Sequence, residues 1–349
     1  MTLRALLRDT AEGSAIAVAV TGAPRDDEVS DELEGSGRLL HPLRVDDAQR
    51  GAGPDPHDGQ GPLDQLAVAR MRGATHFLLP ASLATWLRRY PDLADHLARR
   101  ATLVATNPEG TLWAVPPPPP PGAPRTFCIG LNKTGTSSLH LALQHLGFRS
   151  YHWGSRPAYH AVLEAQRDGE RLLHHVGEEY DAYGDIGTLT VRFDLADLQY
   201  PGSRFILTMR DVDDWMNSRD RHALRNLRDR RAGLYRGSNV QIDRELWRAQ
   251  WDRHNDRVTG WFAGRDDLLV VDLCGGEGWE RLAPFLGRPI PAAPFPHDNI
   301  DGGGSRWGLK PAWRVARRIL PAGVADSIRS TARRASRRAP RRPDDPAGR

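Results

Sequence analysis

The stretch Arg125-Thr-Phe-Cys-Ile-Gly-Leu-Asn-Lys-Thr-Gly-Thr-Ser-Ser-Leu139 decides the fold of this chain of 349 residues. Its first part, Thr126 to Gly130, is a short apolar run bounded by turn residues, which predicts a buried β-strand. A tight loop from Leu131 to Gly135 follows. A helix is then predicted from Thr136, because hydroxyl residues favour a helix start, apolar side chains recur at helical spacing, and Gly147 stands where a helix commonly ends. A strand, a glycine-containing loop and a helix N-terminus in this order form an anion-binding site.

The order of residues inside this loop restricts the kind of anion site. A Walker A loop places its lysine after the second glycine, whereas Lys133 precedes Gly135, and the dinucleotide fingerprint G-x-G-x-x-G is absent. The chain is rich in arginine and has only one other lysine, Lys310, so a compact ammonium group is favoured in the loop over a guanidinium fork. We expect the anion to meet the side chain of Lys133 and the following loop and first-turn residues: Thr134, Gly135, Thr136, Ser137 and Ser138.

A second stretch, Tyr200 to Ser218, supplies the other half of such a site. The apolar run from Phe205 to Met209 predicts a strand, and Arg210 follows at its C-terminal end. Acidic residues directly after Arg210 favour a helix start there. Ser218 comes eight positions after Arg210, about two helical turns further on. Ligands of open α/β sheets bind beyond the C-terminal ends of the strands, where both stretches place their charged residues.

The two stretches resemble a known family. The form K-[ST]-G-[ST]-[ST] that begins at Lys133 resembles the 5′-phosphosulfate loop of sulfotransferases, which use 3′-phosphoadenosine 5′-phosphosulfate (PAPS). The form R-D-x-x-x-W-x-x-S that begins at Arg210 resembles the family element that holds the 3′-phosphate. The resemblance implies that Arg210 and Ser218 bind this phosphate, while Lys133 and the loop amides meet the sulfuryl group. One position departs from the commoner family form, since Asn132 stands where proline is usual.

Two further elements resemble one bacterial branch of the same family. W-E-x-L-x-x-F-L-G-x-P-x-P from Trp279, followed by P-F-P-H-x-N up to Asn299, is similar to the C-terminal end of that branch, so the resemblance covers residues 125–299. The segment Tyr180-Asp-Ala-Tyr-Gly-Asp185 resembles its Y-D-A-x-x-D element, which lines the acceptor cleft. Asp185 is therefore the first candidate for the general base, and His152, at the C-terminal end of a predicted strand, is the second.

For the reaction, the resemblance implies in-line transfer of the sulfuryl group to a hydroxyl or amine, with adenosine 3′,5′-bisphosphate leaving and no divalent metal required. Two alternatives stay open. Asp272 ends a predicted strand, as the acidic residue of a Walker B strand would, which leaves a metal-dependent small-molecule kinase as one alternative. The other is an inactive nucleotide-binding scaffold of a glycan-assembly complex.

The predicted elements divide the chain into four parts: a small α/β accessory domain (residues 1–115), a proline-rich polyproline II linker (116–124), the domain that carries the resemblance (125–305), and an arginine-rich, amphipathic or disordered tail (306–349). The first part is predicted to contain a strand from Ala15 to Val20 and a polar loop from Asp26 to Gly61. Its residues 73–91 resemble an accessory domain found beside bacterial surface-glycan enzymes. In the third part strands alternate with helices, which predicts a doubly wound parallel sheet, and the resemblance implies the P-loop type.

Charge is unevenly placed along the chain. Residues 306–349 hold thirteen basic and three acidic side chains, a net charge of +10, while the whole chain carries +4, so residues 1–305 carry −6. The basic character is therefore a property of the tail, and no specific nucleic-acid partner is expected. The tail is interpreted either as a segment on an anionic membrane surface, near a lipid-linked acceptor, or as a solvated chain.

Composition also bounds location and partners. No apolar run approaches the roughly 20 residues that span a bilayer, and the N-terminus lacks a secretory pattern, so we expect a cytoplasmic protein, with peripheral contact at the inner membrane surface only under the membrane interpretation of the tail. Cys128 and Cys274 fall in predicted core strands and are expected to be reduced packing residues. The expected partners are a small-molecule nucleotide and a carbohydrate or lipid-linked acceptor, whose identity the sequence does not reveal.

Overall fold

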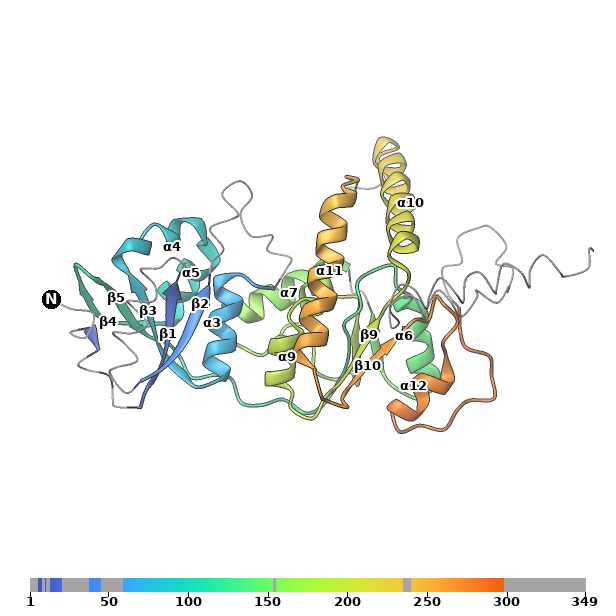
Figure 1. Cartoon of the computed structure of the whole chain (residues 1–349), viewed down its shortest axis with the longest axis horizontal. Coiled ribbons are helices and arrows are strands. Elements are labelled where there is room, and N and C mark those ends of the chain that lie inside the picture. Colours follow the sequence, from blue (N-terminus) through green and yellow to red (C-terminus); the bar gives the residue numbers. More distant parts are fainter. Residues whose placement is uncertain are drawn as a thin grey trace, which may run out of the picture.

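Two five-stranded sheets lie along the longest axis of the molecule, with helices between and around them (Figure 1). The structure is a computed structural model that describes residues 6–7, 10, 13–20, 38–44, 59–152, 155–234 and 240–297. The predicted tail, residues 306–349, lies outside this part of the chain.

The first sheet is mixed and has the order β2-β1-β3-β5-β4. The elements of this part are β1 (Ala15–Val20), β2 (Leu39–Arg44), α3 (Pro62–Met71), β3 (Ala74–Pro80), η2 (Ala81–Leu83), α4 (Trp86–Arg89), α5 (Pro91–Arg100), β4 (Thr102–Asn107) and β5 (Gly110–Ala114). β1 is buried along its whole length and pairs in parallel with β2 and β3, whereas β5 pairs antiparallel with β3 and β4. The prediction of a polar loop from Asp26 to Gly61 was wrong for the residues of β2. The composition of this segment shows no strand pattern, but its backbone hydrogen bonds are satisfied by pairing with β1.

The second sheet is fully parallel and has the order β10-β9-β6-β8-β7. Its elements are β6 (Thr126–Cys128), α6 (Thr136–His145), β7 (Ser150–His152), α7 (Ser155–Arg167), β8 (Ala182–Gly184), α8 (Gly187–Thr190), α9 (Phe193–Gln199), β9 (Arg204–Thr208), α10 (Val212–Arg231), α11 (Arg244–Trp261), β10 (Leu268–Val271) and α12 (Trp279–Phe285). From the central β6 the chain runs outward to β7, returns through β8, and then crosses to β9 on the other side. The strand order reverses at β6, so a crevice is expected beyond the C-terminal ends of β6 and β9.

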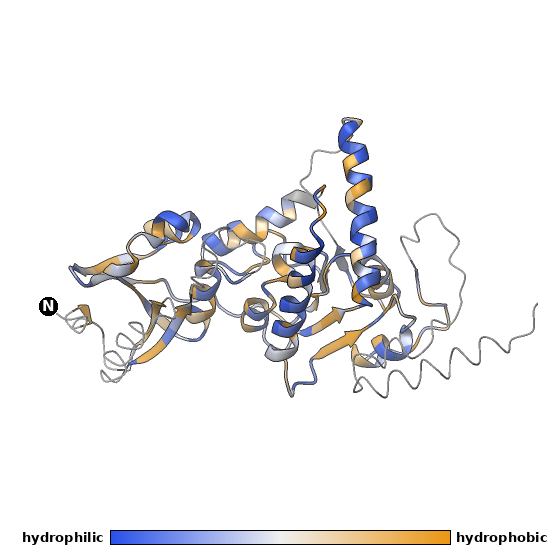
Figure 2. Ribbon diagram, turned by 45° about the horizontal axis from the view of Figure 1, so that its top comes forward, coloured by the Kyte–Doolittle hydropathy of each residue, from blue (hydrophilic) through white to orange (hydrophobic). Residues whose placement is uncertain are grey.

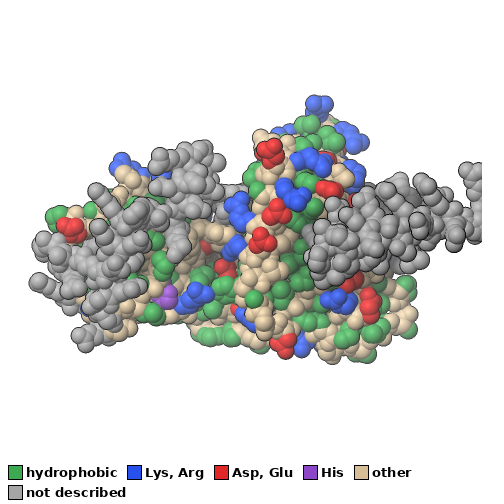
Figure 3. Space-filling view, viewed as in Figure 1, with side chains coloured by type: hydrophobic (Ala, Val, Ile, Leu, Met, Phe, Trp, Pro, Cys, Tyr) green, Lys and Arg blue, Asp and Glu red, His purple; other side chains and the backbone are tan. Residues whose placement is uncertain are grey.

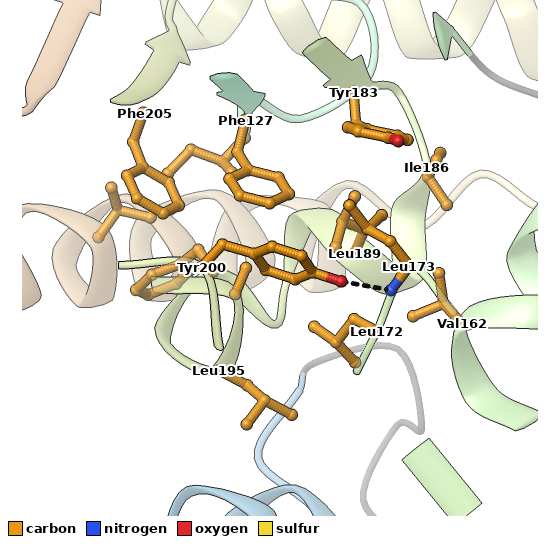
Figure 4. Close-up of a cluster of buried hydrophobic side chains, with 14 of the residues drawn as sticks. Phe127, Val162, Leu172, Leu173, Tyr183, Ile186, Leu189, Leu195, Tyr200 and Phe205 are labelled. Atoms are coloured by element: carbon orange, nitrogen blue, oxygen red, sulfur yellow. Dashed lines mark hydrogen bonds between the residues drawn. The ribbon is translucent and has the colours of Figure 1, made fainter. Parts of the chain in front are cut away.

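Both faces of the second sheet are covered, which confirms the predicted doubly wound arrangement. Side chains alternate along β6, so Phe127 lies in one core and Cys128 in the other. The first core holds Phe127, Tyr183 and Phe205 of the strands against side chains of α7, α8, α9 and α11, and the hydroxyl of Tyr200 accepts a hydrogen bond there from the Leu173 amide at 3.2 Å (Figure 4). α6 and α12 cover the opposite face. The strands are apolar while the outer helix faces are polar (Figure 2).

The helix α3 joins the two sheets into one packed body. Its Ala67 belongs to the first core of the second sheet, and its Asp64 forms a buried ion pair with Arg192, Oδ1 to Nε, at 2.7 Å. Gln166 of α7 bonds both partners, with its Nε2 2.6 Å from Asp64 Oδ1 and its Oε1 2.9 Å from Arg192 Nε. Buried charges persist in this way when they are paired and fully hydrogen-bonded.

The proline run is held against the protein at several carbonyls. Arg70 of α3 donates to Pro116 O at 2.9 Å and to Pro117 O at 2.8 Å, and Arg171 donates to Pro120 O at 3.1 Å. Proline has no amide hydrogen, so its carbonyl is its sole backbone hydrogen-bonding group, and guanidinium groups complement such a run. The run from β5 to β6 is therefore tied to the body rather than a free spacer.

Candidate active site

The predicted anion loop lies between β6 and α6, at the point where the strand order reverses. Gly130 starts it beside β9, where a Cβ atom at this position would come within 1.9 Å of Thr208 Oγ1 and 2.7 Å of Thr208 O. Only glycine permits this approach of the loop to β9. The hydroxyl of Thr208 is also within 2.6 Å of the hydroxyl of Thr134, which joins the far end of the loop to the same strand.

Four backbone carbonyls between Ile129 and Lys133 accept side-chain hydrogen bonds, three from residues outside the loop and one from Thr134 within it. His254 Nε2 lies 2.8 Å from Ile129 O, the Thr134 hydroxyl donates to Leu131 O at 2.5 Å, Trp215 Nε1 donates to Asn132 O at 2.8 Å, and Arg210 donates to Lys133 O at 3.0 Å. In a trans peptide the amide that follows a carbonyl points the opposite way. With these carbonyls held by hydrogen bonds, the following amides are expected to point toward the interior of the loop, which is the arrangement that an anion-binding nest requires.

The helix α6 adds its N-terminus to this nest and begins at Thr136, as predicted. Its N-cap is Gly135 in the left-handed conformation (φ 98°), which brings no capping side chain, so the predicted hydroxyl residues occupy the first turn instead. Thr134 and Ser138 are buried, and the side chain of Thr134 is committed to the loop, which leaves its amide for an anion. The structure thus brings the residues from Lys133 to Ser138 together around one helix N-terminus.

Arg210 enters the same site from the end of β9. Its guanidinium is half-buried and bound to the carbonyl of Lys133, while its buried Nε has no hydrogen-bond partner. A buried donor without an acceptor is costly unless a ligand supplies one. Asp211 then caps α10, accepting from the Asp213 and Asp214 amides at 3.1 Å, in agreement with the predicted helix start.

Ser218 lies on α10, half-buried and two turns beyond its start. α10 packs against α11, and the two helices stand out from the body (Figure 1). Their surface carries both basic and acidic side chains (Figure 3). Between these two helices the guanidinium of Arg219 lies between the rings of Trp215 and Trp247, 4.9 and 4.4 Å from their centroids. These cation–π contacts fix the helix that carries Ser218.

The two candidates for the general base come together at the ends of neighbouring strands. The register pairs His152 of β7 with Gly184 of β8, so Asp185 follows beside it, and His152 Nε2 lies 3.7 Å from Asp185 Oδ2. Lys133 (φ 69°) and Asp185 (φ 56°) are the non-glycine residues with a left-handed backbone among those the structure describes. Such strained conformations persist at functional sites where the surroundings enforce them.

The environment of Asp185 changes its acidity. Burial raises the pKa of its carboxyl group to about 6, while the positive charge of Lys133 acts in the opposite direction. The Asp185 carboxyl is therefore ionised at neutral pH, and neutral pH is close enough to this pKa for the carboxylate to take up a proton. A general base with a pKa near the working pH is the most effective kind.

Three further residues contribute to the site without having been predicted to do so. His254 and Trp215 hold the loop carbonyls, and His140 of α6 stacks on His152 with a centroid distance of 5.0 Å. Burial lowers the pKa of His254 to about 4, so its ring is neutral, and Nε2 must be the donor because a carbonyl only accepts. The spacing of His140 and His152 follows neither the helix nor the strand period, so nothing in the sequence predicts that the two rings are in contact. Trp215 belongs to the R-D-x-x-x-W form and could have been singled out.

Asp272 and Cys274 lie in the turn after β10. Asp272 Oδ1 accepts from the Gly275 amide at 2.6 Å, so this carboxylate caps its own turn. Cys274 was predicted to be in a core strand, which was wrong, because β10 ends at Val271 and the half-buried Cys274 follows it in the turn. Cys128 is buried in β6, and both cysteines are free thiols, in agreement with their predicted reduced state.

Comparison with known proteins identifies the family. Residues 125–236 and 223–303 match the model of a sulfotransferase domain, which together is just over half of the chain and contains β6, Arg210 and the C-terminal motif. The chain belongs to the sulfotransferase family. The chain is also similar to Ava biosynthesis cluster protein M of Aspergillus versicolor, with 24% identity over 238 residues. This match covers 57% of this chain and 90% of that protein. The predicted family and its α/β fold are thereby confirmed, and the protein is a member of a transferase family.

No helix in the described part of this sulfotransferase is long and apolar enough to cross a membrane.

Proposed function

We propose that the protein transfers a sulfuryl group from PAPS to a hydroxyl or amine of an acceptor. The observation that carries this proposal is the pairing of the anion loop with Arg210, because the guanidinium is bound to the loop at Lys133 O and keeps a buried donor with no acceptor. The donor nucleotide has an anionic group at its 5′ end and another at its 3′ position. A loop with inward amides and an arginine beside it fit two such groups.

In this proposal PAPS supplies the sulfuryl group when it is bound. The amides of Thr134 to Ser137 and the ammonium of Lys133 stabilise the negative charge that develops on the transferred group and the leaving oxygen. Arg210 and Ser218 hold the 3′-phosphate and so orient the nucleotide in line with the acceptor. Asp185 and His152, 3.7 Å apart from Oδ2 to Nε2, form the pair that accepts the proton of the acceptor hydroxyl.

For the acceptor we propose a carbohydrate or another small hydroxyl compound, free or lipid-linked. The name of the fungal relative places that protein in a biosynthesis cluster, which fits a small-molecule acceptor as well as a sugar. The alternative with a specific observation is the kinase, which needs an acidic residue for its metal ion. Asp272 is bound within its own turn, which favours the sulfotransferase.

Calorimetric titration with adenosine 3′,5′-bisphosphate, without divalent metal, tests the proposal. Wild type is expected to bind, and Lys133→Ala and Arg210→Ala are each expected to weaken binding by about 10- to 100-fold, the effect of losing a charged hydrogen bond of about 1.5–3 kcal/mol. Arg228→Ala, an exposed position on α10, is the matched control and should bind like wild type. Tighter binding of ATP with Mg²⁺ would establish the kinase instead. Binding of PAPS without turnover against any acceptor would establish the scaffold.

A further inference from the structure

His140 of α6 is tied to β7 by two contacts. Its Nδ1 lies 2.8 Å from the hydroxyl of Ser150, and its ring stacks on that of His152 at a centroid distance of 5.0 Å and an interplanar angle of 26°. Ser150 and His152 are two positions apart in one strand, so their side chains leave the same face. One histidine of α6 therefore spans both, at the end of the strand where His152 meets Asp185.

We propose that His140 is a positioning residue that holds the ring of His152 against Asp185, so that the two act as one proton-accepting pair. This inference rests on the proposed function and names a residue that the family motifs do not include. His140 itself lies behind His152, in contact with its face, and not at the edge that meets Asp185. The two contacts to β7 restrict the rotation of the His152 ring, which a partly exposed imidazole would otherwise retain.

His140 is neutral although charged groups lie around His152. Asp185 faces His152 from the end of β8, and Lys133 acts on Asp185 from the anion loop. Burial lowers the pKa of His140, so this ring stays uncharged while the pair beside it takes up a proton. A neutral aromatic face stabilises an adjacent imidazolium, whereas a second cation would repel it.

The proton balance of the step is simple. As the acceptor oxygen forms its bond to sulfur, its O–H bond breaks and the proton passes to the Asp185–His152 pair. The bond from sulfur to the leaving phosphate oxygen breaks at the same time, and that oxygen keeps the electron pair. His140 exchanges no proton and acts only on the geometry of the pair.

The test compares three single variants of the full chain. His140→Leu removes the aromatic stack, His140→Phe keeps it, and His145→Leu changes an exposed histidine of the same helix as a control. The readouts are the release of adenosine 3′,5′-bisphosphate from PAPS with a panel of phenols and sugars, the affinity for the bisphosphate, and the ring-nitrogen resonances of His152 in ¹H–¹⁵N spectra, assigned with His152→Gln.

We expect His140→Leu to lower kcat about tenfold without changing bisphosphate affinity, and to shift and broaden the His152 resonances at constant pH, while His140→Phe restores most of the rate. His145→Leu should change none of these. An active wild type whose rate and His152 resonances survive His140→Leu overturns the inference, as does a His140→Phe variant as slow as His140→Leu. A wild type that neither binds the bisphosphate nor consumes PAPS overturns the proposed function, and the His152 resonances then still decide whether His140 orders that ring.

Discussion

The buried ion pair between Asp64 and Arg192 is expected to be a principal link between the two sheets. The side chains of Arg192 and Asp64 are only 4% and 10% exposed. Replacing Arg192 with methionine removes the cation from beside Asp64 Oδ1 and the hydrogen bond from its NH1 group to Thr188 O at 3.0 Å. Asp64 then retains donors at Gln166 Nε2 and the Gly61 amide, but no positive charge. Breaking such a pair leaves an uncompensated buried charge, so we expect Arg192→Met to destabilise the protein by about 3–5 kcal/mol.

Urea unfolding followed by tryptophan fluorescence measures this loss. The control is Arg149→Met, which removes a surface pair with Asp181 whose arginine is 67% exposed, and it should leave the free energy of unfolding nearly unchanged, because solvent screens an exposed pair. The double variant Asp64→Leu, Arg192→Met removes both charges and should recover part of the stability, because no buried charge remains, although the buried Gln166 loses both of these hydrogen-bond partners. The reasoning is refuted if Arg192→Met is as mild as Arg149→Met, or if the double variant is less stable than Arg192→Met alone.

Three further variants change the anion loop, its anchor and the candidate general base. Gly130→Ala should cost at least about 1–3 kcal/mol in chemical denaturation, since the new Cβ overlaps the backbone of β9, whereas Gly260→Ala in α11, with open space around it, should be neutral or stabilising. Asp185→Asn should be more stable than wild type at pH 8 by up to about 3 kcal/mol and equal to it near pH 4. The pKa of the Asp185 carboxyl is raised from 3.8 to about 6 in the folded protein, so the free energy of unfolding of the wild type falls as pH rises through this window. Equal pH profiles of the unfolding free energy for the two proteins would contradict this. The same variant should lose PAPS turnover. Trp215→Phe removes one donor to the loop carbonyl of Asn132 and should weaken bisphosphate binding about 2- to 10-fold by calorimetry, and unchanged affinity would show that the loop does not need this anchor.

The sequence predicted the elements whose signal is local. The strands around Phe127 and Phe205 are short apolar runs between turn residues, and both appear at the centre of the parallel sheet. The helix after Gly135 and the cap at Asp211 also follow from neighbours within three positions. Motif order was informative too, because the position of Lys133 before Gly135 is enough to distinguish this loop from a Walker A loop.

The parts that sequence reasoning missed depend on long-range contacts. His254 reaches Ile129 across 125 positions of the chain, and Trp215 reaches Asn132 across 83. β2 forms because it pairs with the edge of β1, and the residues of β2 themselves show no strand pattern from which this could be predicted. The predicted boundary at the proline run stays a prediction. The side chains of α3 in the first core of the second sheet, and the arginines that bind the proline carbonyls, show how closely the parts before and after the proline run are connected.

The anchoring of the loop carbonyls has a consequence for how a ligand enters. Three carbonyls between Ile129 and Lys133 are bound by residues outside the loop and a fourth by Thr134 within it, so the conformational entropy of the loop is lost during folding and not during binding. Such a preorganised nest does not need to close around its ligand. If the proposed function holds, the affinity for the anion is expected to be governed by desolvation and charge, and the on-rate by diffusion in the field of Lys133 and Arg210.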